Sequence, residues 1–305
     1  MTRRFLTADV FTDRPFGGNP LAVLPEASGL SNEQMQRIAA EFNLSETAFV
    51  LPPDDPRHAR RVRIFTPASE LPFAGHPTIG TAIVLASVGE IDLVGDETRI
   101  VLEEGAGPVP VTIRRAAGGT LTAQLTAPIP PRRVDVDLPD AAAIAAAVSL
   151  DAGDLQDGAF TPEVWSAGVP FLIVAVRDLD MLARARIDPA AWDPIASHTG
   201  LREVYLFTHA AGAGADVRVR MFAPGLGIAE DPATGGGAAA FAGYLAVRTR
   251  LRDGTACWVI HQGVEMGRPS VLEIEADKRD GVVIASRVSG TAVLVMEGTL
   301  TVGGN

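Results

Sequence analysis

The sequence predicts an α+β protein of two similar domains, each a curved mixed sheet wrapped around a central buried helix. Three observations predict this fold. A chain of 305 residues exceeds the usual size of one hydrophobic core. The two halves share sequence text at a fixed spacing, and each half contains a helical segment that is apolar on nearly every face. We expect the two domains to be related by approximate twofold symmetry.

The internal repeat appears at a shift of 157 residues. This shift lays R-V-R-I-F-T-P (61–67) over R-V-R-M-F-A-P (218–224), and L-S-E-T-A-F-V (44–50) over L-R-E-V-Y-L-F (201–207). After a two-residue adjustment, G-H-P-T-I-G-T-A (75–82) falls on E-D-P-A-T-G-G-G (230–237), which pairs His76 with Asp231. A repeat of about 150 residues indicates a duplicated domain, because solenoid repeats are much shorter.

Local patterns place the elements of the first half. Short runs rich in β-branched or aromatic residues, each bounded by turn residues, predict strands at 20–25, 47–51 and 61–66. An amphipathic helix is expected at 31–43, where Ser31 and Gln34 have the spacing of a capping box.

The segments 78–88 and 233–247 are apolar on nearly every face, which predicts two buried central helices. Pro77 and Pro232 suit the first position of each helix. The proline-rich stretch 128–133 looks like the linker between domains. The expected division is therefore an N-terminal domain at 1–130, a C-terminal domain at 135–290, and a final strand within 291–305 that pairs back onto the first domain.

Composition excludes several functions. The net charge is -11, so nucleic acid and anionic membranes are poor partners. Cys257 is the single cysteine, which rules out an intrachain disulfide, and no stretch approaches the roughly 20 apolar residues of a membrane span. We therefore expect a cytoplasmic protein with a small-molecule partner.

Cofactor chemistry also lacks support in the sequence. There is no P-loop, no dinucleotide fingerprint after a strand, and no H-E-x-x-H zinc helix. The five histidines show no metal-ligand spacing: His58, His76, His198, His209 and His261. We expect neither a cofactor nor a metal.

Three ionisable residues are the candidate catalytic groups. Glu46 directly precedes the apolar run T-A-F-V, where partial desolvation raises the pKa of a carboxyl toward neutrality and suits it to acid/base catalysis. His76 and Asp231 occupy matched positions of the repeat at the two helix starts. The structural alternatives are a strand-end salt bridge for Glu46 and helix capping for His76 and Asp231.

Glycines next to these groups are the candidate substrate-binding residues. Gly75 and the run Gly235, Gly236 and Gly237 allow backbone N–H groups at a helix start to approach an anion. Asn19, in G-G-N-P at 17–20, is either a turn residue or a hydrogen-bonding group for the substrate.

Taken together, the motifs resemble the phenazine-biosynthesis PhzF-like family. The resemblance rests on D-x-F with G-N-P-x-A-V (9–23), S-E-T-A-F-V (45–50), F-T-P-x-x-E-L-P-F-A-G-H-P-T (65–78), E-D-P-A-T-G (230–235) and Q-G-x-x-M-G-R-P-S (262–270), which span nearly the whole chain.

The resemblance implies a diaminopimelate-epimerase-like fold, a homodimer, and catalysis without cofactor or metal. It also implies that a glutamate shuttles a proton while a histidine and an aspartate assist, roles that pass to Glu46, His76 and Asp231. One departure concerns the substrate. The family usually has A-T-G-S-A where this chain reads A-T-G-G-G, so Gly236 replaces a serine.

The resulting hypothesis is a cofactor-independent isomerase that moves a proton on a small carboxylic acid bound in the interdomain cleft. One alternative is a one-base epimerase or racemase of an amino-acid-like substrate, since the lone Cys257 excludes a pair of catalytic thiols. Another is a small-molecule binding protein that has lost catalysis. Glu46 argues against pure anion binding, because a carboxylate repels an anion.

Overall fold

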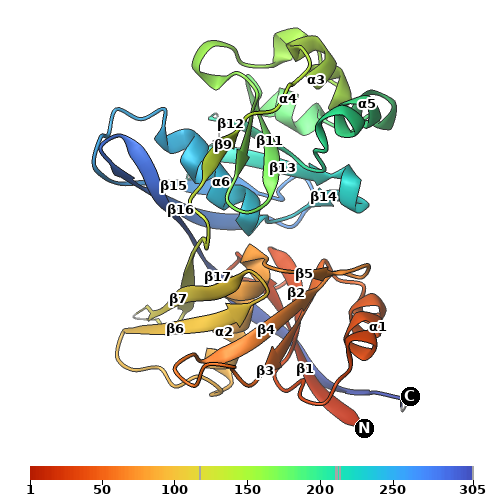
Figure 1. Ribbon diagram of the computed structural model, residues 1–305, viewed down its shortest axis with the longest axis vertical. Helices are drawn as coiled ribbons and strands as arrows, with labels where there is room; N and C mark the ends of the chain where they lie inside the picture. Colours follow the sequence, from red (N-terminus) through yellow and green to blue (C-terminus); the bar gives the residue numbers. More distant parts are fainter. Residues whose placement is uncertain (117, 210–211, 213, 304–305) are drawn as a thin grey trace. The chain divides into compact units, whose positions relative to one another are not determined.

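The computed structural model describes residues 1–303 apart from 117, 210, 211 and 213 (Figure 1). The chain divides into two compact units. Unit 1 comprises Met1–Pro128 and Val288–Asn305, and unit 2 comprises Ile129–Arg287. Residues 304 and 305 of the expected final segment lie outside the described residues.

Unit 1 is built from strands and two helices. Its elements are β1 (Thr2–Val10), β2 (Asn19–Leu24), α1 (Asn32–Phe42), β3 (Glu46–Leu51), β4 (Arg60–Phe65), β5 (Glu70–Leu71), α2 (Gly75–Ser87), β6 (Glu97–Glu104), β7 (Gly107–Arg115) and β8 (Leu121–Thr126). The long strand β17 (Val282–Thr301) pairs antiparallel with β1, in a register that runs from Thr2↔Thr301 to Val10↔Ala292.

Unit 2 repeats this plan with additional helices. Its elements are β9 (Arg132–Val134), α3 (Ala141–Ala147), β10 (Glu163–Ser166), β11 (Pro170–Ala175), α4 (Leu179–Arg184), α5 (Pro189–Thr199), β12 (Val204–Thr208), β13 (Val217–Ala223), β14 (Ile228–Asp231), α6 (Gly235–Ala246), β15 (Gly254–Gln262) and β16 (Ser270–Arg279). Short 3-10 turns lie at Ala152–Asp154, Gly158–Phe160 and Pro224–Leu226.

The two units share one order of strand pairing. In unit 1, β2 and β3 are parallel, β3 and β4 are antiparallel, and β4 and β6 are parallel. In unit 2, β11 and β12, β12 and β13, and β13 and β15 follow the same order. Both sheets are therefore mixed, and the predicted α+β class is confirmed.

Each sheet wraps around one helix. In unit 1, α2 packs against β1, β2, β3, β7 and β8, and in unit 2, α6 packs against β9, β10, β11, β15 and β16 (Figure 1). Every residue of α2 from Gly75 to Leu85 is buried, as is nearly all of α6. Side chains without charge on any face suit that position, because no side of the helix meets water.

The predicted starts of the central helices are wrong in detail. Both prolines were expected at the first helical position, but Pro77 is the third residue of α2 and Pro232 precedes α6 in the turn after β14. Pro77 is tolerated because the first four N–H groups of a helix have no intrahelical acceptor. Pro232 is accommodated because it lies outside the helix.

The outer helices differ from the central ones in capping. Side-chain oxygens of Ser31, Asp140, Asp178 and Asp188 accept hydrogen bonds from the first turns of α1, α3, α4 and α5. The predicted capping box of Ser31 and Gln34 is confirmed. Ala74 and Thr234, the N-cap residues of α2 and α6, provide no such side-chain bond.

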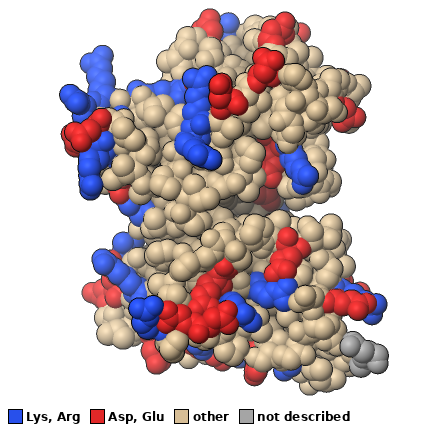
Figure 2. All heavy atoms as spheres, viewed as in Figure 1, with Lys and Arg blue, Asp and Glu red and all other residues tan. Residues whose placement is uncertain are grey.

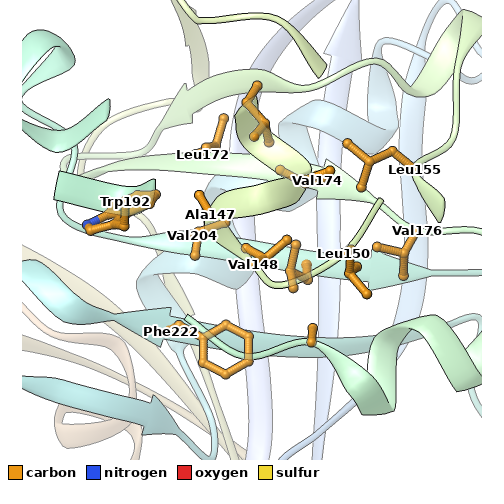
Figure 3. Close-up of a cluster of buried hydrophobic side chains, with 14 of the residues drawn as sticks. Ala147, Val148, Leu150, Leu155, Leu172, Val174, Val176, Trp192, Val204 and Phe222 are labelled. Carbon is orange, nitrogen blue, oxygen red and sulfur yellow. The ribbon is translucent and has the colours of Figure 1, made fainter. Parts of the chain in front are cut away.

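Two further hydrophobic clusters lie on the other faces of the sheets. In unit 2, α3 and its neighbours pack Ala147, Val148 and Trp192 against Leu172, Val204 and other strand residues (Figure 3). In unit 1, the outer helix α1 buries Met35, Ile38 and Ala39 against Phe49 and Phe65. Each sheet is thus covered by its central helix on one face and by outer helices on the other, which fixes the helix starts within each unit.

Candidate active site

In unit 1, three of the predicted site residues lie in one polar cluster. Glu46 begins β3, and its Oε2 atom is 3.2 Å from Nε2 of His76 in the first turn of α2. The other ring nitrogen of His76, Nδ1, is 3.2 Å from the side-chain amide nitrogen of Asn19. The side chains of Glu46 and His76 are 12% and 5% exposed, and Asn19 is fully buried. The carboxyl is therefore largely withdrawn from water.

The turn before β2 fixes the position of Asn19. Gly18 has φ +61°, and a Cβ atom there would lie 2.2 Å from the carbonyl oxygen of Val10. Only glycine fits so close an approach in this conformation. The loop is also held by Asp9, whose carboxylate accepts a hydrogen bond from the Phe16 N–H at 2.7 Å. This loop therefore places Asn19 at the start of β2, opposite Val10.

His76 is a neutral imidazole at physiological pH. Burial lowers its pKa to about 3, although the backbone carbonyl of Pro20 partly opposes this by favouring the charged ring. The 3.2 Å contact does not have the geometry of a hydrogen bond at Nε2, so the neutral ring places a polar edge beside the carboxyl without adding charge to the site. The pair therefore places one titratable acid/base group beside a polar, uncharged neighbour.

The start of α2 is held by a buried carboxyl that the sequence analysis missed. Glu104 ends β6, and its Oε1 atom accepts a 2.6 Å hydrogen bond from the Thr78 hydroxyl. The backbone N–H of Ala74 also donates to this carboxyl. Burial raises the pKa of Glu104 to about 8, against the effect of these two bonds. Glu104 is therefore protonated at neutral pH.

In unit 2, Gln262 holds the start of α6 in the same way. Gln262 ends β15, and its side-chain oxygen accepts from the Thr234 backbone N–H at 3.2 Å. Its amide nitrogen donates to the Asp231 carbonyl at 2.8 Å and to the Thr234 hydroxyl at 3.0 Å. The Thr234 hydroxyl in turn donates to the Asp231 carboxylate at 2.5 Å. Asp231 is thereby tied into the turn before α6, and it is 8% exposed.

The glycines that open α6 are not equivalent. A Cβ atom at Gly237 would lie 2.9 Å from the Tyr205 ring, so the helix and β12 approach too closely for a side chain. At Gly236 the nearest atom to such a Cβ is in Phe171, at 4.0 Å, which leaves room for one. The absence of the family serine at Gly236 therefore has no steric cause within unit 2.

The helix starts correct the predicted pairing of the two halves. With Ala74 and Thr234 as the two N-caps, Gly75 matches Gly235, and His76 matches Gly236 instead of Asp231. Asp231 then corresponds to Leu71. The two-residue adjustment made from sequence was wrong because it matched Pro232 with Pro77, which lies inside α2, whereas Pro72 and Pro232 each stand three residues before a helix start.

The predicted residues are thus divided between the units. Asn19, Glu46, Gly75 and His76 lie together in unit 1, whereas Asp231, Gly235, Gly236 and Gly237 lie together in unit 2. Glu104 and Gln262 could have been found from the sequence, because each is followed by glycine and the two positions differ by nearly the repeat shift. No group of three potential metal ligands occurs among the described residues.

The surface carries no broad patch of one charge in the visible view. Figure 2 shows acidic and basic side chains interspersed on the drawn faces of both units. Across the described residues, every helix falls short of the length and apolar character that a membrane span requires. An anionic substrate would therefore depend on local donors such as the helix starts.

Comparison with known sequences gives matches over nearly the full chain. Residues 8–298 match the family described as "Phenazine biosynthesis-like protein". An uncharacterized isomerase of Mesorhizobium japonicum is 41% identical, over 98% of this chain and 99% of the relative. The trans-2,3-dihydro-3-hydroxyanthranilate isomerase of Pseudomonas aeruginosa is 37% identical, over 97% of this chain and 98% of the relative.

Solved structures confirm the fold that the resemblance implied. A PhzF-family phenazine biosynthesis protein of Bacillus anthracis superposes with a TM-score of 0.89 at 25% identity, covering 99% of both chains. A probable proline racemase of Agrobacterium radiobacter shares the fold with a TM-score of 0.67 at 14% identity, covering 99% of this chain and 93% of the racemase.

Proposed function

The chain belongs to the phenazine biosynthesis-like protein family and is an isomerase, and we propose that it moves a proton within a small carboxylic acid, with Glu46 as the acid/base group. The observation that carries this proposal is the contact of Glu46 with His76. It pairs a nearly buried carboxyl with a neutral imidazole, beside a helix start that has no side-chain cap.

In the proposed reaction, the Glu46 carboxylate takes a proton from a carbon of the substrate. The electrons of that C–H bond move into the adjacent double bond, and the negative charge spreads over the conjugated acid. The protonated Glu46 then returns the proton at the other end of this system. Atoms and charge balance without a redox partner. His76 orients the carboxyl, and its lack of charge keeps Glu46 able to accept a proton.

We propose that the substrate carboxylate is bound by N–H groups at the helix starts. Gly75 in α2, and Gly235, Gly236 and Gly237 in α6, have the backbone freedom and the helix dipole for this task. Asp231 would assist in unit 2. Asn19 would fix the ring of His76.

The proposed substrate class is a small, unsaturated carboxylic acid with one ring, related to the compound named for the Pseudomonas aeruginosa relative. Gly236 offers only its N–H where the family usually has a serine hydroxyl. A substrate group that needed this hydroxyl would lose about 1 to 3 kcal/mol of binding. The chain is therefore expected to prefer an acid with one fewer polar group at that point. A homodimer and a cytoplasmic location stay predictions.

Solvent-deuterium exchange tests the proposed function. The wild-type protein is incubated in D2O with trans-2,3-dihydro-3-hydroxyanthranilate and with related cyclic unsaturated acids, and incorporation is followed by NMR. We expect exchange at carbon with at least one acid. Glu46→Gln should lower that exchange by at least about 10²-fold, because the amide cannot accept the proton.

Glu33→Gln is the matched control, since Glu33 lies on the outer helix α1 with a side chain that is 70% exposed. It should exchange like the wild type. Bound acid without any exchange in the wild type would contradict the proposal and favour a binding protein. Inversion of a stereocentre without movement of a double bond would make the chain an epimerase instead.

A further inference from the structure

Unit 2 contains a pocket of about 630 Å³ that the proposed function does not use. Its walls come from the loop between α4 and α5, the end of β13, and the hairpin that joins β13 to β14. Phe222 of β13 lines it and also belongs to the hydrophobic cluster under α3 and α5. The pocket therefore lies on the face of the sheet that α6 does not cover.

The helices that lie beside this face, α1 in unit 1 and α5 in unit 2, occupy matched positions of the repeat. A shift of 157 residues lays Asn32–Phe42 over Pro189–Thr199. In unit 1, the side-chain oxygen of Asn32 accepts a hydrogen bond from Arg63 at 2.6 Å. This bond ties the start of α1 to β4.

The corresponding bond is missing in unit 2. Pro189 replaces Asn32 and Arg220 replaces Arg63, and a proline side chain has neither a donor nor an acceptor. Both Pro189 and Arg220 line the pocket. The pocket thus lies at the point where unit 1 has a polar bridge between its outer helix and its sheet.

Hydrogen bonds hold the loop that forms one wall of the pocket. The backbone N–H groups of Arg186 and Asp188 donate to the carbonyls of Val148 and Ala147, each at 3.0 Å. Arg220 donates to three backbone carbonyls at the end of α4, at 2.9 to 3.1 Å. The wall is therefore fixed without a ligand, as in most small-molecule sites.

Two carboxylates line the pocket, and each is paired with an arginine. Glu230 accepts hydrogen bonds from Arg220 at 2.8 and 2.7 Å. Glu265 accepts from Arg218 at 3.2 Å, and its Oε2 atom is enclosed, so that oxygen offers no surface to a ligand. Arg186 is the remaining charged residue of the lining, and it forms no ion pair among the described residues.

The guanidinium of Arg186 is only partly used by the protein. Its Nη1 atom donates to the carbonyls of Ala183 and Ala185, at 2.8 and 2.6 Å. The side chain is exposed, and Nε and Nη2 keep their N–H groups for a ligand. Next to this cation, Ile187 and Ile228 add apolar surface to that of Phe222. The pocket thus combines one uncompensated positive charge with apolar walls.

We propose that this pocket binds a small carboxylic acid with an apolar body, whose carboxylate pairs with Arg186 and whose body packs against Ile187, Phe222 and Ile228. A guanidinium recognises a carboxylate through charge-assisted hydrogen bonds, which fix the orientation of the acid. Burial of the apolar body supplies the remaining affinity. An amine of the same shape lacks an accessible unpaired carboxylate in the lining.

This site is separate from the proposed acid/base group. Glu46 lies in unit 1, and Asp231 is not among the residues that line the pocket. Ile228 and Glu230, which do line it, belong to β14, the strand that ends at Asp231. A second acid therefore binds beside the strand that carries a candidate site residue, and the proposal does not depend on the proposed function.

Methyl NMR tests the site directly. Protein labelled with ¹³C at the isoleucine δ1-methyl groups is titrated with benzoate, and Ile187→Val and Ile228→Val identify the two pocket resonances. We expect both resonances to shift along one saturating curve. Benzylamine, which has the opposite charge, and inorganic phosphate, which has no apolar body, should each bind at least about tenfold more weakly than benzoate.

Variants of Arg186 test the role of its charge. Arg186→Gln should raise the Kd of benzoate at these two methyl groups by at least about tenfold, because it removes the charge-assisted bonds. Arg186→Lys keeps the charge and should raise the Kd by less than the glutamine variant does. Arg184→Gln is the matched control, since Arg184 lies two residues away with a side chain that is 60% exposed, and it should bind like the wild type.

Three results would overturn the proposal: no shift of the Ile187 and Ile228 methyl groups, an unchanged Kd in Arg186→Gln, or benzylamine binding as tightly as benzoate. The methyl group of Ile79, which is buried in α2, reports on unit 1. A shift of Ile79 alone would place the acid in unit 1 and would also contradict the pocket. If Arg186→Gln does not fold, the lysine variant and the comparison of benzoate with benzylamine still decide the proposal.

Discussion

The starts of α2 and α6 share one hydrogen-bonding arrangement but carry different side chains. In both units the N–H of the N-cap residue donates to the side chain that ends a strand, which is Glu104 in unit 1 and Gln262 in unit 2. The second helical residue is His76 in α2 and Gly236 in α6. Unit 1 thus presents an imidazole where unit 2 presents only backbone.

Both units retain a carboxyl at the head of the strand beside the helix, Glu46 and Glu203. In unit 1 the Glu46 carboxyl lies beside a neutral ring, whereas in unit 2 burial raises the pKa of the Glu203 carboxyl and the charge of Asp231 raises it further.

Two arginines at matched positions of the repeat, Arg63 and Arg220, also share one arrangement and differ in their surroundings. Arg63 binds Glu70 through two hydrogen bonds and lies over the Phe65 ring. In unit 2, Arg220 binds Glu230 in the same bidentate way and lies over Phe222.

Burial separates the two pairs, since the side chain of Arg63 is 22% exposed and that of Arg220 is 3% exposed. Arg220 also donates to backbone carbonyls at the end of α4, at 2.9 to 3.1 Å from residues 182, 183 and 185.

The largest expected effect comes from breaking the ion pair of Arg220 and Glu230 in unit 2. Arg220→Met leaves the Glu230 carboxylate and the α4 carbonyls without their donor, and should lower the free energy of unfolding by about 3 to 5 kcal/mol. Arg63→Met removes a more exposed partner and should cost about 1 kcal/mol or less. Urea unfolding followed by circular dichroism measures both.

The double variant Arg220→Met with Glu230→Leu sharpens the same test. Removing both charges should recover part of the lost stability, because no buried charge then lacks a partner. Equal losses in Arg63→Met and Arg220→Met would show that burial does not distinguish the two pairs.

The sequence predicted the duplicated fold because the repeated segments are strands and helices with buried residues. The R-V-R-x-F-x-P text marks β4 and β13, and the apolar segments mark α2 and α6, since each pattern reports burial directly. The position of Glu46 at the head of β3 follows from the same logic, because the apolar run after it enters the core. The contact between Glu46 and His76 does not, since they come from different elements.

Other parts of the site depend on packing that no local pattern reports. Glu104 could be found by its match with Gln262 at nearly the repeat shift, but the local sequence of β6, E-T-R-I-V-L-E-E, does not show that the Glu104 side chain points inward to Thr78. Pro77 and Pro232 suggested a common helix position, but the turns before α2 and α6 place them differently. The capping of these turns is decided by strands that lie far away in the sequence.

The next largest expected effect is a pH-dependent loss of stability caused by Glu104, the carboxyl that is bonded to the start of α2. The folded pKa of Glu104 is raised to about 8 from an unfolded value near 4.5. Its contribution is therefore complete below pH 4.5 and is lost as pH rises toward 8, at up to about 1.4 kcal/mol per pH unit. Glu104→Gln, which copies unit 2, should lack this part of the loss, whereas the loss caused by Glu203, whose pKa burial raises to about 7, is common to both proteins. The measurement is the difference in unfolding free energy between wild type and variant at each pH.

The contribution of His76 to stability has the opposite dependence on pH. It is the same in wild type and Glu104→Gln, so it cancels in the difference between their unfolding free energies. The folded pKa of His76 is lowered to about 3, so both proteins lose stability together as pH falls below about 6.5. The reciprocal variant Gln262→Glu should introduce an alkaline loss into unit 2, because the new carboxyl would be equally enclosed. A parallel pH course for wild type and Glu104→Gln would show that Glu104 is ionised in the folded protein.

The smallest effect separates two adjacent glycines of α6. Gly237→Ala places a methyl group 2.9 Å from the Tyr205 ring and should destabilise the fold by about 1 to 3 kcal/mol. Gly236→Ala meets nothing closer than Phe171 at 4.0 Å, and should be neutral or stabilising by less than about 1 kcal/mol, because alanine favours a helix. Thermal unfolding of the two variants measures the difference. If Gly236→Ala is as unstable as Gly237→Ala, glycine at 236 is kept for the fold. If it is stable but alters which acids undergo exchange, Gly236 is kept for the substrate, and the two helix starts differ by function instead of packing.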